Sequence, residues 1–243
     1  MSRTVLITRH PADCSELREL LAPHGNRLHP YPVLRLETLD PTRDLEAVCR
    51  TVGPGDPGWL LLASPRAARP FVGHLEGAGA SHLARLPAAA VGRATADAGL
   101  EVGLRVEVVG PGTGLGLAEE LAPRLPADTP LVFPCGRHRR SELPDALTAA
   151  GHRVFPVEVY AMLATPPREL PPLPPTLDAV VVTSPRAARL YLEGVGGQPL
   201  PCRHVALGPT TRDAAAALGI ACTIPPEPQM SSLAEELCQE LQE

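Results

Sequence analysis

Short apolar runs alternate with segments rich in Ala, Leu and Glu along the chain. The runs that we expect to be strands are residues 4–8, 59–63, 88–92, 105–110, 130–134, 154–160, 179–183, 204–208 and 222–225. Segments between them, such as 14–25, 115–125 and 141–151, have the composition of helices. Apolar strands that alternate with helices of about ten residues are typical of parallel βαβ units with right-handed crossovers. The pattern predicts an α/β fold built on parallel sheets.

The chain also repeats itself in blocks. The sequence SPRAAR occurs at 64–69 and again at 184–189, an offset of 120 residues. Residues 92–103 match 208–219 at an offset of 116, and residues 15–30 match 141–156 at an offset of 126. Offsets that are constant within a block and change only between blocks indicate loop insertions in a duplicated chain. We therefore expect two similar α/β domains, although the sequence alone leaves open which blocks pack together.

Two extended segments are candidates for the passage between the domains. The proline-rich stretch TPPRELPPLPPT at 165–176 has the composition of a stiff linker, and VFPVEVYAML at 154–163 runs into it. Residues 31–42 contain the other candidate crossing. Two extended crossings would suit two domains joined by a pair of strands.

The bulk composition is that of a soluble globular protein. The 243 residues are 44% hydrophobic and 20% charged, and the net charge is −5, so nothing global favours nucleic acid or an anionic membrane as a partner. No apolar stretch approaches the length of a membrane span, and the N-terminus has no signal-peptide core. The six cysteines lack CxxC spacing, which fits reduced thiols. We expect a cytoplasmic protein that binds neither nucleic acid nor membrane.

All 22 basic residues are arginine. The absence of lysine excludes a Walker A loop with its usual lysine, a Schiff-base lysine and ordinary PLP chemistry. The glycine-rich stretch GPGTGLG at 110–116 fails the dinucleotide pattern, which makes a turn before a helix the better interpretation. The eight histidines show no metal spacing, and neither GxSxG nor HExxH occurs. We therefore predict neither a cofactor nor a metal.

The repeated SPRAAR segments have the character of helix starts. Ser64 and Ser184 are expected N-caps, each followed by a proline at the first helical position. Arg66 and Arg186 then fall in the first helical turn, where they oppose the helix dipole slightly but could join the free N–H groups in binding an anion. The alternative is that both guanidinium groups are simply solvated.

Polar residues also follow other predicted strands. The Gly-x-x-Thr turns at 92–95 and 208–211 could admit a ligand to the backbone, or could be only a turn glycine and a helix cap. PCGRHRR at 134–140 is a dense basic cluster that could bind carboxylates or phosphates, or be a solvated loop. Tyr160 lies in the crossing at 154–163 and could donate a hydrogen bond into a cleft between domains, or be a buried strand aromatic.

The ordered set of motifs resembles the uroporphyrinogen-III synthase family. It comprises TVLITR near the start, the strand-SP-helix units, the AVG/ALG-x-x-T turns, VFPVEVY before the linker and the closing SSLAEEL. The resemblance implies two flavodoxin-like parallel-sheet domains joined by a two-stranded linker. Residues 1–35 plus 168–243 would form a discontinuous domain 1, and 36–167 an inserted domain 2. In two places the chain departs from the family pattern, with Ala63 where Thr is usual and arginine after each SP where asparagine is common.

The resemblance also implies a reaction. A synthase of this family cyclises hydroxymethylbilane to uroporphyrinogen III with loss of water, through an azafulvene and a spiro intermediate that inverts ring D, and without cofactor or metal. Tyr160 would be the catalytic proton donor or orienting group. The substrate-binding residues would be Thr8, Arg9, Ser64, Gly92, Thr95, Gly136, Arg137, Ser184, Arg186, Gly208, Thr210 and Thr211.

A cytoplasmic monomer acting on this small-molecule substrate in heme biosynthesis is expected, and a transient contact with hydroxymethylbilane synthase is left open. The alternative function is a non-catalytic two-domain binder or sensor of anionic tetrapyrroles. No appended output domain such as a helix-turn-helix is evident in the sequence, which weighs against that alternative.

Overall fold

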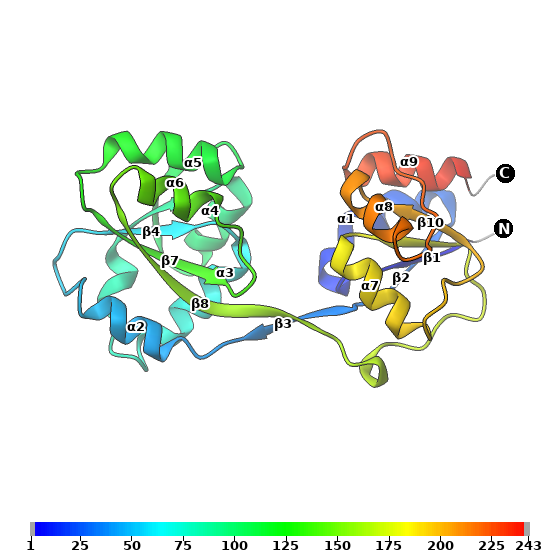
Figure 1. Cartoon of the computed structure of the whole chain (residues 1–243), viewed down its shortest axis with the longest axis horizontal. Coiled ribbons are helices and arrows are strands. Elements are labelled where there is room, and N and C mark those ends of the chain that lie inside the picture. The colour runs from blue at the N-terminus through cyan, green and yellow to red at the C-terminus, as the bar shows by residue number, and fades with distance from the viewer. Residues whose placement is uncertain (1–2, 241–243) are drawn as a thin grey trace. The chain divides into compact units, whose positions relative to one another are not determined.

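The computed structural model describes residues 3–240, and contacts between residues divide the chain into two units (Figure 1). Unit 1 comprises Met1–Arg35 with Leu163–Glu243, and unit 2 comprises Leu36–Met162. Each unit has a sheet with helices on both faces. The predicted α/β fold with parallel sheets is confirmed.

Unit 1 is built on a four-stranded parallel sheet. Its strands lie in the order β10 (Arg203–Ala206), β9 (Ala179–Val182), β1 (Thr4–Ile7) and β2 (Arg27–Pro30). One face packs against α1 (Ser15–Leu21) and α9 (Met230–Glu240). The other face packs against α7 (Pro185–Gly194) and α8 (Pro209–Ala216). The short 3-10 helices of the unit are η1 (Pro11–Asp13), η2 (Ala22–His24) and η5 (Pro167–Glu169).

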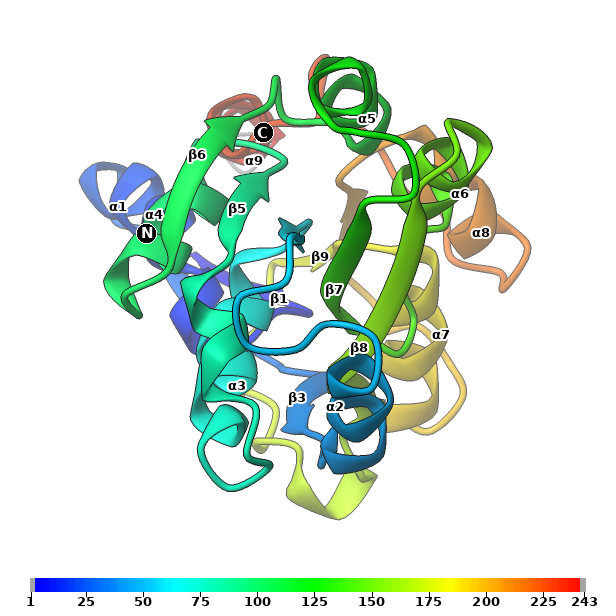
Figure 2. The same ribbon diagram turned by 90° about the vertical axis from the view of Figure 1, so that its left-hand side faces the viewer.

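Unit 2 repeats this plan with one strand more at each edge. The strand order is β3 (Leu34–Thr38), β8 (Arg153–Ala164), β7 (Pro130–Gly136), β4 (Trp59–Leu62), β5 (Pro87–Ala90) and β6 (Arg105–Val109). One face packs against α2 (Thr42–Cys49), α3 (Pro65–Leu75) and α4 (Arg93–Glu101). The opposite face packs against α5 (Gly114–Leu121) and α6 (Glu142–Ala149), as Figure 2 shows. Two 3-10 helices complete the unit, η3 (Ser81–Arg85) and η4 (Ala122–Arg124).

The strand registers confirm the duplication. Thr4 pairs with Arg27 in unit 1 and Pro130 pairs with Arg153 in unit 2, which are the same two positions at the offset of 126. Leu60 pairs with Ala88 in unit 2, and their counterparts at the offsets of 120 and 116, Val180 and His204, pair in unit 1. Because β1 pairs with β9, the first block of the chain packs with the last block.

Burial explains why most strands were visible in the sequence. All four residues of β9 are buried, as expected for a parallel strand covered on both faces, and such strands are nearly continuous apolar runs. The edge strand β2 has no fully buried residue and was not among the predicted strands. The predicted strand at 222–225 is reduced to a single bridge between Val205 and Thr223.

The chain passes between the units within two paired strands, β3 and β8. The Thr165 amide donates to the Val33 carbonyl, and the Leu39 amide donates to the Val159 carbonyl, both at 3.0 Å. These two bonds fix an antiparallel pairing. Across residues 3–240, none of the helices has the length and apolar character that crossing a membrane would require.

Candidate active site

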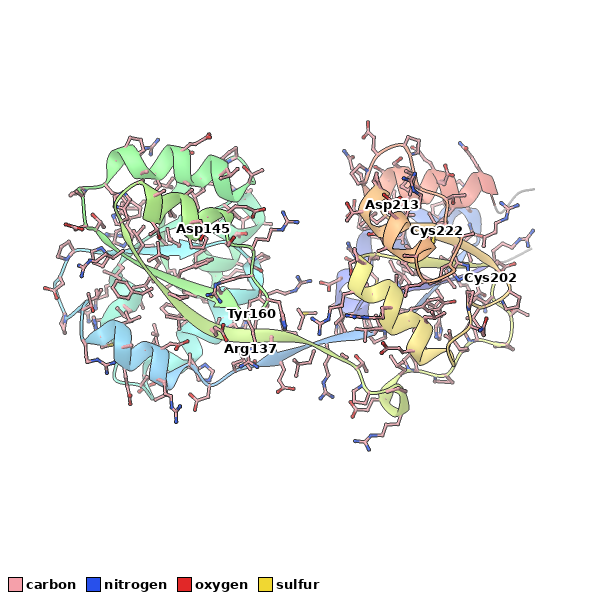
Figure 3. All side chains as sticks on the ribbon, viewed as in Figure 1. Arg137, Asp145, Tyr160, Cys202, Asp213 and Cys222 are labelled. Carbon is pink, nitrogen blue, oxygen red and sulfur yellow. The ribbon has the colours of Figure 1, made fainter. Side chains whose placement is uncertain are left out.

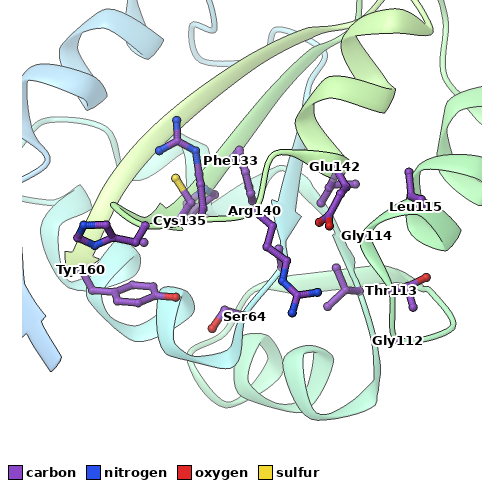
Figure 4. A pocket seen from close by; sticks show the side chains of 17 residues that line it. Ser64, Gly112, Thr113, Gly114, Leu115, Phe133, Cys135, Arg140, Glu142 and Tyr160 are labelled. Atoms are coloured by element: carbon purple, nitrogen blue, oxygen red, sulfur yellow. The ribbon is translucent and has the colours of Figure 1, made fainter. Parts of the chain in front are cut away.

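A pocket of about 570 Å³ opens in unit 2 at the carboxyl ends of β4 and β7 (Figure 4). These neighbouring strands lead in opposite directions, because the chain continues from β7 through α6 to β8 and from β4 through α3 to β5. Their carboxyl ends therefore form the topological switch point of the sheet, where open α/β sheets bind ligands. The walls come from the β4–α3 turn, the start of α5, the end of β7, the loop 138–142 and Tyr160.

Tyr160 and Ser64 lie on one side of this pocket. Figure 4 shows the Tyr160 ring with its hydroxyl directed into the pocket toward Ser64. The half-buried ring also packs against the core beneath the sheet. Within residues 3–240 no group forms a hydrogen bond with the Tyr160 hydroxyl, so it is available to a ligand.

The caps of the two SPRAAR helices are as predicted. Ser64 Oγ accepts a hydrogen bond from the Arg66 amide at 3.3 Å, and Ser184 Oγ accepts one from the Ala187 amide at 3.1 Å. In both helices proline occupies the first helical position. The serines therefore have a structural role whether or not they also contact a ligand.

The basic loop after β7 contains arginines in different states. Arg137 Nε donates to Glu158 Oε2 at 3.2 Å, and Arg139 Nη1 donates to Glu158 Oε1 at 3.1 Å, so that two guanidinium groups share one carboxylate. The Glu158 amide is in turn held by Asp44 Oδ2 at 3.0 Å. Arg140 extends into the pocket (Figure 4) and has no ion-pair partner in the part of the chain that the structure describes.

The glycine-rich stretch 110–116 forms the wall opposite. Thr113 caps α5, its Oγ1 accepting from the Gly116 amide at 3.1 Å, so the stretch is the turn before a helix that the sequence favoured. Gly112 has a φ of 100°, a left-handed value that favours glycine. A Cβ at Gly92, the N-cap of α4, would lie 3.2 Å from the Gly112 Cα, so the absence of a side chain at 92 lets the two turns approach closely.

Cys135 contributes a thiol to the same pocket. Burial raises the pKa of this thiol to about 11, against the opposing influence of Arg139. The raised pKa favours the protonated thiol at neutral pH and so disfavours a thiolate nucleophile at this position.

The structure gathers part of the predicted site into this pocket. Ser64, Gly136 and Tyr160 line it, while Gly92, Thr95 and Arg137 belong to unit 2 but not to its lining. The remaining predicted residues belong to unit 1: Thr8, Arg9, Ser184, Arg186, Gly208, Thr210 and Thr211. Lining residues absent from the predicted set include Thr113, Arg139 and Arg140. The dense basic cluster at 134–140 already indicated the arginines in the sequence. No sequence pattern indicated that Thr113 lies beside them.

Of the four threonines of the predicted set, Thr210 is exposed and the other three are buried in the fold. Thr8 is 3% exposed, and its Oγ1 donates to the Val181 carbonyl at 3.2 Å while accepting from the Thr183 amide at 3.2 Å. Thr95 and Thr211 are also buried. The alternative that these two threonines cap their helices is wrong, because Gly92 and Gly208 occupy the N-cap positions.

Comparison with known proteins agrees with this architecture. Residues 15–235 match the family model of uroporphyrinogen-III synthase HemD. A solved uroporphyrinogen-III synthetase from Helicobacter pylori 26695 is 16% identical, with a TM-score of 0.66 and coverage of 98% of this chain and 99% of that one. A mutant uroporphyrinogen III synthase from the extreme thermophile Thermus thermophilus is 18% identical, with a TM-score of 0.58 and 99% coverage of both chains. The structural likeness shows a shared fold, and the family model covers most of the sequence, so the chain belongs to the uroporphyrinogen-III synthase family, whose members are cyclising lyases of heme biosynthesis.

Proposed function

We propose that the unit 2 pocket receives the hydroxymethyl end of hydroxymethylbilane and that Tyr160 is the group that assists its ionisation. The hydroxymethyl C–O bond breaks as the pyrrole nitrogen supplies electrons and gives up its N–H proton, and the departing oxygen takes up a proton and leaves as water. A hydroxyl that donates to this oxygen stabilises the charge that develops on it. The observation that carries the proposal is the Tyr160 hydroxyl, which points into the pocket without a hydrogen-bond partner among residues 3–240.

The azafulvene that remains then closes through the spiro intermediate that inverts ring D. Cyclisation proceeds without an enzyme but gives the wrong isomer, so the protein's main task is to fold the chain of pyrroles. Positioning of this kind needs neither metal nor nucleophile, and the protonated Cys135 thiol is consistent with that requirement.

The acetate and propionate groups of the substrate require cationic or N–H donors. Arg140 suits this role in unit 2, since its guanidinium lies in the pocket and is not neutralised by a carboxylate of the described chain. We also propose substrate contacts for the other predicted residues apart from Gly136, which is treated below. These are Ser64, Gly92, Thr95 and Arg137 of unit 2 and Thr8, Arg9, Ser184, Arg186, Gly208, Thr210 and Thr211 of unit 1.

The wider setting is proposed on the family relationship. The substrate of the family is a small-molecule tetrapyrrole. We propose a cytoplasmic monomer that receives hydroxymethylbilane by transient contact with its synthase, and domains that comprise 1–35 plus 168–243 and 36–167.

Isomer analysis tests the proposed function. The protein is incubated with hydroxymethylbilane, the products are oxidised, and the porphyrin isomers are separated by chromatography. We expect the type III isomer in excess over the type I isomer that forms without enzyme. A product that stays type I, even where the tetrapyrrole binds, would overturn the proposal and favour the binder or sensor instead.

A substitution tests the role of Tyr160. Tyr160→Phe should lower kcat roughly tenfold or more through loss of one donor, with the fold unchanged. Tyr31→Phe is the matched control, because that hydroxyl is buried in unit 1 and donates to the Gly194 carbonyl. An unchanged kcat for Tyr160→Phe would remove Tyr160 from the chemistry.

A further inference from the structure

We propose that Gly136 is a positioning residue for Tyr160, and that any side chain at position 136 moves the phenol out of its reactive orientation. The inference rests on the proposed role of Tyr160. It assigns to Gly136 an action through the aromatic ring instead of a direct contact with substrate.

The first support is the close approach of the two residues. A Cβ built on Gly136 would lie 2.7 Å from Tyr160 Cζ, 2.8 Å from Cε2 and 3.0 Å from the hydroxyl oxygen. Carbon atoms that are not bonded prefer separations of about 3.5–4.0 Å. The phenol therefore occupies the space that any other residue at 136 would fill, and the contact is made by the hydroxyl end of the ring.

The strand pairing brings the two residues together. Cys135 pairs with Glu158, but Gly136 pairs with Tyr160, so β8 advances two residues where β7 advances one. This irregularity is a β-bulge, a device that redirects side chains and is common beside active sites. Just beyond it, the Arg137 amide donates to the Tyr160 carbonyl at 2.9 Å, which holds the backbone of Tyr160 against β7. Figure 3 labels both residues, which lie near each other at the ends of these strands.

The backbone itself does not require glycine at this position. Gly136 is not among the residues with a left-handed φ, so alanine could adopt the same conformation without strain. The obstacle is only the far end of a half-buried side chain at the edge of a pocket, which can rotate away. An alanine at 136 should therefore leave the fold intact and displace the phenol.

Kinetics of a double-mutant cycle test this inference on the full-length protein. Gly136→Ala should lower kcat by about as much as Tyr160→Phe, with KM and the thermal midpoint close to wild type. The double variant should be no slower than the slower single variant, because both changes remove the same interaction. Gly73→Ala is the matched control, since that glycine in α3 has no atom within 4 Å of an added Cβ.

A spectroscopic measurement follows the ring directly. The chain has three tyrosines, so 3-fluorotyrosine labelling gives three ¹⁹F resonances, and Tyr160→Phe identifies the one that belongs to Tyr160. Gly136→Ala should shift that resonance and leave those of Tyr31 and Tyr191 in place.

Each outcome separates the inference from the function on which it rests. If Tyr160→Phe retains the wild-type kcat, the proposed role of Tyr160 fails. If Tyr160→Phe is slow but Gly136→Ala is not, the positioning inference alone fails. Losses that multiply in the double variant would also overturn it, because alanine would then be obstructing the substrate itself. A Gly136→Ala protein that does not fold would contradict the argument that the ring can move cheaply.

Discussion

Replacement of Tyr191 by phenylalanine should destabilise unit 1 more than the loss of a single hydroxyl normally does. Tyr191 is fully buried in α7 and its hydroxyl makes two hydrogen bonds, one with His204 Nε2 at 2.9 Å and one from the Leu200 amide at 3.1 Å. His204 Nδ1 lies 3.0 Å from the Cys202 carbonyl, which can only accept. Nδ1 therefore carries the proton, Nε2 accepts from Tyr191, and the hydroxyl is free to accept from Leu200.

The magnitude follows from the two groups that lose their partner. A buried polar group left without a hydrogen bond costs about 1–3 kcal/mol. His204 is 7% exposed and should incur the larger share, whereas Leu200 is half-buried and its amide can be partly rehydrated. We expect Tyr191→Phe to lower the free energy of unfolding of unit 1 by about 2–4 kcal/mol.

Hydrogen exchange resolves this effect unit by unit. Peptides that cover residues 179–206 report on β9 and β10, and their slowest amides should exchange roughly thirtyfold to a thousandfold faster in Tyr191→Phe. Fluorescence of Trp59, the single tryptophan, monitors unit 2 separately. In the control Tyr31→Phe, one hydrogen bond within residues 3–240 is lost, from the hydroxyl to the Gly194 carbonyl at 3.2 Å, and about 1 kcal/mol is expected. Equal destabilisation by the two substitutions would refute the argument from two orphaned groups.

Three further predictions concern pH, a helix cap and the substrate. Burial lowers the pKa of His204, so the unfolded chain binds a proton that the folded chain does not, and stability should fall as pH drops below about 6.5, the ordinary histidine value. Denaturant midpoints measured at pH 7 and pH 5.5 check this prediction. It is wrong if the midpoint of the wild type does not fall, or if that of His204→Gln falls equally far. Ser184→Ala should cost about 1 kcal/mol in the same unfolding measurement and Ser184→Gly only a few tenths, unless the bond to the Ala187 amide is unimportant. Arg140→Ala should raise KM for hydroxymethylbilane severalfold with little change in stability. The control Arg124→Ala, which breaks a surface ion pair with Glu120, should leave KM unchanged. Equal KM values for the two variants would show that Arg140 does not bind the substrate.

The fold was largely predictable because most of its strands are buried on both faces. A strand such as β9, AVVV, is recognisable without knowledge of its neighbours, and the repeated offsets predicted that strands would recur in the same register. The edge strand β2 escaped because its residues, RLHP, are partly exposed and polar. The sequence pattern of an edge strand is weak, because one of its edges has no neighbouring strand and its residues are less buried.

The candidate site was predictable only in part, for a related reason. The run from 137 to 140 contains three arginines that look equivalent in the sequence. Glu158, the carboxylate that distinguishes them, comes from β8 and binds Arg137 and Arg139 but not Arg140. The difference between the paired arginines and Arg140 arises only when β7 and β8 pair, so the spacing of residues along the chain could not predict it.

The duplication provides an independent argument for coupling between Gly136 and Tyr160. At the offset of 126 that relates β7 and β8 to β1 and β2, the counterpart of Tyr160 is Leu34 and the counterpart of Gly136 is His10. The β1–β2 pairing ends at Ile7 and Pro30, whereas the β7–β8 pairing continues through the bulge. The copy without the aromatic ring thus also lacks the glycine and the bulge. If glycine were required only by the backbone that both copies share, we would expect it in both copies. A glycine that makes room for the Tyr160 ring is needed only in the copy that has the ring.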